Sequence, residues 1–311
     1  MKALLLPSGQ AEPCWREWRR SADLEHLDAG ALLLLPMLAH RLPAWLADDP
    51  ARGVLLGICR RCWSHNQLKL RQLDHVVRDL REAGIGLIVV SGSAAWMFLY
   101  RPALRPIESL ELVIRREHVA KAADALMTVG WTPAREIATG EDMDRIEGVW
   151  FDRGPDRLKL GWRIVPASPE IAAERENLPR LQSVQICDES ASLLAPEEML
   201  LHALAGYRDP CEIDWRSDAL QLLKSRRVNW RRMRGLLRDE PLALSRAREL
   251  HEQWGAAIPA GVFRAPARWE TLCRDYRKRA WQQRRPCSLA GFAVYLGRRS
   301  WRRFVRVRSR A

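Results

Sequence analysis

The spacing of apolar residues changes twice along the chain. Before residue 84 and after residue 192, apolar positions recur every three or four residues, which is typical of helices with one buried side. Between these parts, short apolar runs typical of buried strands alternate with helical stretches. The pattern predicts an α+β (or α/β) protein, in which a small mixed sheet lies between N-terminal helices and a helical C-terminal half. The expected helices are 12–27, 31–46, 52–82, 93–100, 117–129, 192–205, 211–225, 229–238 and 241–255, and the expected strands are 85–90, 109–114, 131–137, 147–151, 157–165 and 184–187.

One corner of the predicted sheet carries the residues with the clearest chemical meaning. The strand 85–90 ends at a turn that contains Gly92 and Ser93, and an apolar helical stretch follows. A glycine in such a turn lets the backbone approach a phosphate closely, and the start of the next helix offers free N–H groups to an anion. The strand 109–114 comes next and carries Glu111. This order predicts a phosphate-binding turn beside an acidic strand.

That order of glycine–serine turn, helix and acidic strand resembles the DNA polymerase β-like nucleotidyltransferase superfamily, and within it a bacterial family of nucleotidyltransferase-like proteins. The segments 158–164 and 194–202 resemble the next strand and the helical region of that family, so the resemblance covers roughly residues 15–255. It implies a nucleotidyltransferase fold and an ancestral transfer of nucleotides from a nucleoside triphosphate with Mg²⁺. It also implies that Gly92 and Ser93 contact phosphate. Arg105, just before the acidic strand, either meets a phosphate or is a surface arginine.

The chain departs from the family at its metal-binding carboxylates. Members typically carry three, two in an Asp-x-Asp strand and one on a neighbouring strand, whereas this chain has Ser109, Glu111 and Lys159 at those positions. An ammonium group at position 159 would repel a divalent cation and could pair with Glu111 instead. Glu108 cannot easily replace the missing acid, because residues 108 and 111 of a strand point to opposite faces.

The resemblance and these departures together predict a nucleotidyltransferase-like protein with impaired or lost catalysis. Mg²⁺ and nucleoside triphosphate are then cofactor and ligand only if the site is active, and Glu111 is the only matching metal ligand. A strand alignment wrong by one residue remains open, and Lys159 would then be a surface residue.

Most of the positive charge lies at the C-terminal end. The chain has 51 basic and 38 acidic residues; fourteen of the former and two of the latter lie in residues 268–311, which therefore carry +12 and leave +1 for residues 1–267. Bulky apolar residues alternate with arginines there, which favours docking on something negative. The candidate docking residues are Arg298, Arg299, Trp301, Arg302, Arg303, Phe304 and Arg306. An anionic membrane surface, nucleic acid, and simple packing on the rest of the chain remain open. A non-catalytic binding or adaptor protein is accordingly the alternative function.

Other features set the expected organisation and location. A proline-rich linker at 259–266 and the change in charge predict an N-terminal helical region (1–84), an α/β core (85–190), a helical region (191–258) and a basic tail (268–311). The longest apolar stretch, 31–39, contains a proline and is too short to cross a bilayer. We therefore expect a cytoplasmic protein, and peripheral association with the inner membrane face remains open. Cys59 and Cys62 form the one C-x-x-C, and without a second pair we expect reduced cysteines that pack like small apolar residues.

Overall fold

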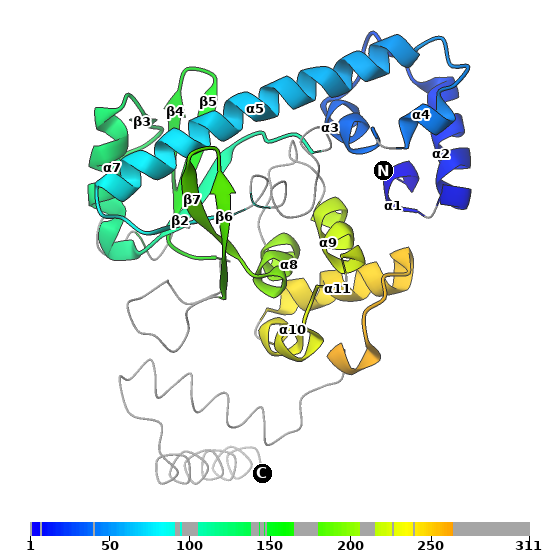
Figure 1. Ribbon diagram of the computed structural model, residues 1–311. Coiled ribbons are helices and arrows are strands. Elements are labelled where there is room, and N and C mark those ends of the chain that lie inside the picture. The colour runs from blue at the N-terminus through cyan, green and yellow to red at the C-terminus, as the bar shows by residue number, and fades with distance from the viewer. Residues whose placement is uncertain are drawn as a thin grey trace, which may run out of the picture. The chain divides into compact units, whose positions relative to one another are not determined.

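In a computed structural model, residues 1–262 place a mixed sheet between N-terminal and C-terminal helices (Figure 1). The expected helix 93–100, apart from Ala94, and the basic tail 268–311 lie outside the described residues. The structure describes residues 2–6, 8–39, 41–90, 94, 105–137, 143, 146, 148–164, 180–205, 215–225, 227–238 and 240–263.

Within the described residues, five helices precede the sheet, and the long one has the predicted bounds. They are α1 (Lys2–Leu5), α2 (Ser8–Ser21), α3 (Ala29–Met37), α4 (Leu42–Trp45) and α5 (Arg52–Glu82). The single helix predicted over 31–46 is wrong, because the chain forms two helices there. Asp28 caps the start of α3 by accepting a hydrogen bond from the Ala31 N–H at 2.7 Å. Pro36 has no N–H to continue the helix, and Pro43 lies in the first turn of α4, where a proline is favourable.

The sheet is mixed, as predicted, and among the described residues it has seven strands rather than the six expected, in the order β3-β4-β5-β2-β1-β7-β6. β2 runs parallel to β5 and β1 runs parallel to β7, while the other neighbours are antiparallel. The predicted helix 117–129 appears as a short 3-10 helix, η1 (Arg116–His118), followed by α7 (Val119–Thr128). The strands are β1 (Leu87–Val89), β2 (Leu110–Ile114), β3 (Thr132–Pro133), β4 (Gly148–Arg153), β5 (Asp156–Gly161), β6 (Leu181–Ile186) and β7 (Glu189–Leu194).

β7 corrects one prediction. Residues 192–194 were expected to begin a helix, yet they end a strand that pairs with both β1 and β6. The turn between β6 and β7 is tight and has Cys187 at φ 46°. The buried Asp74 of α5 accepts hydrogen bonds from the backbone N–H groups of Asp188 (3.1 Å) and Glu189 (2.9 Å). α5 thereby fixes the turn that makes this hairpin.

The two faces of the central strands differ in burial. Leu110, Leu112, Leu158 and Leu160 share one face, and each is at most 1% exposed. Glu111 and Lys159 lie on the other face and are half-buried. Helix α5 packs against β6 and β7, and α7 packs against β3 (Figure 1). Alternation along the strands thus leaves the polar residues on the less buried face.

The C-terminal half of the unit is helical, as predicted. It comprises α8 (Pro196–Ala205), α9 (Trp215–Lys224), α10 (Trp230–Leu237), α11 (Pro241–Trp254) and the short 3-10 helix η4 (Ala260–Val262). Asn229 caps α10 by accepting from the Arg232 N–H at 3.2 Å, and Gly255 ends α11 with a φ of 64°. In the ranges that the structure describes, no helix is both long and apolar enough to cross a membrane.

Candidate functional site

The half-buried face of the sheet carries a row of three residues from neighbouring strands. Glu111 of β2 pairs in register with Lys159 of β5, and Lys159 pairs with Trp150 of β4. Residues paired in this way point to the same face of a sheet. The register therefore places Lys159 beside Glu111.

Lys159 directs its ammonium group toward Trp150. The Lys159 Nζ atom lies 5.8 Å from the centroid of the Trp150 ring, a cation–π distance, and the guanidinium carbon of Arg157 lies 4.6 Å from the same centroid. The expected ion pair between Lys159 and Glu111 is not found: within the part of the chain described here, no N–O distance of 4 Å or less joins them. Trp150 holds the lysine, and sequence reasoning missed this cross-strand partner.

Ser109 lies at a bend immediately before β2, two residues ahead of Glu111. Like Glu111 it is half-buried, whereas Glu108 is exposed. The candidate site thus offers one hydroxyl, one carboxylate and one ammonium group.

These groups do not fit a magnesium ion. Mg²⁺ requires an octahedral set of oxygen ligands, usually anchored by carboxylates. Glu111 supplies the only carboxylate of the three positions, and the neighbouring cation opposes a second positive charge. Across the described ranges, no group of three or more His, Cys, Asp and Glu side chains is arranged to hold a metal ion.

Arg105 is a buried arginine, which excludes the surface alternative. It is 5% exposed, and its guanidinium donates two hydrogen bonds to the Asp218 carboxylate of α9, at 2.8 and 2.9 Å. Asp218 is 3% exposed, so the pair lies in the interior. Arg216, two residues before Asp218 on α9, pairs with Glu249 of α11. Arg105 thus ties the segment before β2 to the helical half.

The same segment is held from its other side by α5. The side chain of Asn66, which is fully buried, donates to the Arg105 carbonyl at 2.7 Å and accepts from the Ile107 N–H at 2.9 Å. An amide that bonds both backbone groups of an extended segment replaces the strand partner that the segment lacks. Two helices, α5 and α9, therefore fix the segment that leads into β2 and Glu111. An asparagine among the buried positions of a helix was the signal for this contact.

Other predicted site residues lie beyond what the structure describes. Gly92 and Ser93, expected at a phosphate, are outside the described residues. So are the tail residues expected to dock on a negative surface: Arg298, Arg299, Trp301, Arg302, Arg303, Phe304 and Arg306.

The C-x-x-C cysteines lie on the buried side of α5. Cys59 and Cys62 are both buried, and burial raises the pKa of the Cys62 thiol to about 12, with a further contribution from Cys59. Both residues are therefore neutral thiols at physiological pH, and they pack as small apolar groups.

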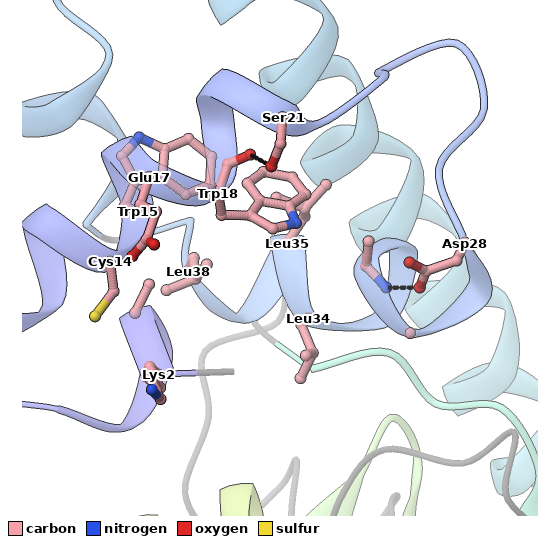
Figure 2. A pocket seen from close by; sticks show the side chains of 13 residues that line it. Lys2, Cys14, Trp15, Glu17, Trp18, Ser21, Asp28, Leu34, Leu35 and Leu38 are labelled. Carbon is pink, nitrogen blue, oxygen red and sulfur yellow. Dashed lines mark hydrogen bonds between the residues drawn. The ribbon is translucent and has the colours of Figure 1, made fainter.

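A cavity of about 440 Å³ lies among the N-terminal helices, apart from the row of Glu111, Lys159 and Trp150 (Figure 2). Trp18 and Leu34 contribute half-buried surface to its walls, while Lys2 and Glu17 carry charge at its border. Its lining residues come from α1, α2, and α3 with the residues that flank α3, so it shares no residue with the candidate site.

Comparison with known proteins identifies the family. The family described as "uncharacterised nucleotidyltransferase" matches residues 29–244. None of the curated proteins matches the sequence. The cavity residues of α1 and α2 precede the matched range.

Three solved structures are similar at low identity. A solution structure of the antibiotic-resistance factor ANT(2'')-Ia is 13% identical, with 60% of this chain and 100% of that chain covered and a TM-score of 0.40. A crystal structure of ANT(2'')-Ia with adenylyl-2''-tobramycin is 14% identical, covering 58% and 99%, with a TM-score of 0.40. A nucleotidyltransferase-like protein from Paracoccidioides brasiliensis is 14% identical, covering 64% and 97%, with a TM-score of 0.40. On the family match over most of its length, this chain belongs to the uncharacterised nucleotidyltransferase family.

Proposed function

We propose that this member of the nucleotidyltransferase family has lost metal-dependent nucleotidyl transfer at the face formed by β2 and β5. The observation that carries the proposal is the register, in which Lys159 lies directly beside Glu111. Nucleotidyl transfer in this superfamily depends on cations that bridge the phosphates and the carboxylates. A lysine held on Trp150, with a serine at position 109, leaves such a cation one carboxylate.

Metal binding tests the proposal without knowledge of the acceptor substrate. Mn²⁺, which can be followed by electron paramagnetic resonance, is titrated into the wild-type chain and into the double variant S109D/K159D. We expect binding only in the double variant, because three carboxylates then surround one position. The triple variant S109D/E111Q/K159D should lose that binding. The single variant K121D, at an exposed lysine of α7, makes a comparable charge change away from the site.

Catalysis by the unmodified chain would contradict the proposal. The wild-type protein is incubated with a mixture of nucleoside triphosphates and Mg²⁺, and pyrophosphate release is measured beside E111Q. Release that depends on Glu111 would make this protein an active enzyme. Equal background release from both proteins supports a lost activity.

We also infer a second function, docking of the basic segment 268–311 on an anionic partner, with the family fold acting as a non-catalytic adaptor. The net charge of +12 in this segment, against +1 for the rest of the chain, supports the inference. Its alternation of arginines with Trp301 and Phe304 favours a membrane surface over nucleic acid. Replacement of Arg298, Arg299, Arg302 and Arg303 by glutamine should weaken pelleting with anionic vesicles. If it weakens only binding to duplex DNA, the segment binds nucleic acid instead.

A further inference from the structure

The solvent-facing side of α5 is basic over most of its length. The one acid between residues 52 and 78 is Asp74, which is 3% exposed and holds the β6–β7 turn. The exposed arginines in this stretch are Arg52, Arg60, Arg61, Arg71 and Arg78. Arg60, Arg61 and Arg71 form no ion pair with any residue that the structure describes. Their charges are therefore available to a partner.

Large apolar side chains are exposed among these arginines. Val54 is 53% exposed, Trp63 is 48% exposed and Leu68 is 67% exposed. Single exposed apolar residues are common on proteins, but three on one helix within a basic surface are unusual. Exposure of these apolar side chains to water is unfavourable, and contact with an apolar region of a partner would remove that cost.

Spacing brings two of these apolar residues, Val54 and Leu68, to the same side of α5 as Arg61. Val54, Arg61 and Leu68 follow each other at intervals of seven residues, close to two helical turns, so they form one line along the helix. Arg71 lies three residues beyond Leu68, on the neighbouring line. With 31 residues, α5 is about 45 Å long, so this surface is extended and straight.

We propose that this side of α5 docks on the surface of an anionic lipid bilayer. Basic residues are attracted to anionic headgroups, and Val54 and Leu68 gain by entering the boundary between headgroups and acyl chains. A second copy of α5 is a poor partner, because the two arginine-rich surfaces would repel each other. The phosphates of a nucleic acid would bind the arginines but would bury little of the apolar surface of Val54 and Leu68. The proposal concerns a folded helix and does not depend on the basic tail.

Vesicle flotation with the full chain tests the proposal. The probes are vesicles of phosphatidylcholine alone and vesicles that also contain phosphatidylglycerol. The variant R60Q/R61Q/R71Q removes three charges from α5, and R20Q/K121Q/R231Q removes three from exposed positions elsewhere. We expect the α5 variant to bind anionic vesicles about a hundredfold more weakly than wild type, since each basic residue contributes roughly a factor of five. The control variant should lose only a few-fold.

A second variant tests the apolar contribution. L68S should weaken binding to anionic vesicles by roughly threefold to tenfold and leave binding to duplex DNA unchanged. Equal losses in both charge variants, or no binding of wild type to anionic vesicles, would overturn the proposal. The proposal would also be overturned if the α5 variant lost binding to duplex DNA but kept binding to anionic vesicles, because α5 would then be a nucleic-acid surface. Thermal melts of every variant show whether the fold is kept.

Discussion

The buried pair of Arg105 and Asp218 gives the sharpest test of how the segment before β2 is held. Replacement of Asp218 by alanine leaves a guanidinium that is 5% exposed without the carboxylate that accepts two of its hydrogen bonds. Removing one partner of a buried ion pair typically costs about 3–5 kcal/mol, because the other charge is left uncompensated. For a unit of this size, that loss lowers the melting temperature by about 6–20 °C.

The matched control is the surface pair of Arg157 and Asp152. Its nitrogen–oxygen distance is 3.2 Å, but the two side chains are 55% and 45% exposed. Removing Asp152 should therefore cost no more than about 1 kcal/mol. Thermal and urea unfolding of D218A, R105A and D152A measure the differences. A loss below 1 kcal/mol in D218A, or equal losses in D218A and D152A, would refute the reasoning.

The double variant R105L/D218L removes both charges. It therefore separates the net contribution of the ion pair to stability from the cost of removing only one of its partners. Buried ion pairs that are replaced by apolar residues of similar volume are often neutral in stability. We therefore expect R105L/D218L to be more stable than either single replacement. If R105L/D218L is less stable than both single variants, the pair contributes far more than charge compensation. The free energies of unfolding of the three variants, measured in urea, decide between these outcomes.

Three further predictions concern other parts of the fold. G148A should strongly lower the melting temperature, because a Cβ atom at position 148 would lie 2.7 Å from a β5 backbone carbonyl oxygen. Burial alone would raise the pKa of Asp156, but Lys69, with smaller contributions from Gln72 and Arg153, lowers it below 3.8. The stabilisation from this carboxylate is present above pH 3.8 and lost as pH falls through the lowered pKa; melts from pH 7 to pH 2 should show D156N less stable than wild type at neutral pH, with the gap closing in acid. In native protein, iodoacetamide should label the exposed Cys187 and spare the buried Cys62, and peptide mass spectrometry would show any labelling of Cys62.

The sequence was most informative where a pattern is local. Helix α5 has the predicted bounds, 52–82, because apolar residues recur at helical spacing from Leu55 to Leu80 and the helix ends before Gly84, which adopts a φ of 70°. The register places Lys159 beside Glu111. That these two residues occupy the family's carboxylate positions stays a prediction from the resemblance.

Features that depend on distant partners could not be predicted in this way. β7 lacks β-branched residues, and it is a strand because β1 and β6 pair with it. Asn66 meets the backbone of Arg105 across 39 positions of sequence, and Arg105 meets Asp218 across 113. Nothing in the local pattern selects these partners among the other polar residues. Trp150 beside Lys159 depends likewise on the pairing of β4 with β5.

The contacts of α5 have a consequence for how the unit opens. This helix packs against α3, α7, β6 and β7, so its amides are protected by both the N-terminal helices and the sheet. The N-terminal helices therefore cannot unfold cooperatively on their own without exposing the apolar side of α5. In hydrogen–deuterium exchange, amides in the middle of α5 and in the central strands should exchange together, at the slowest rate in the unit.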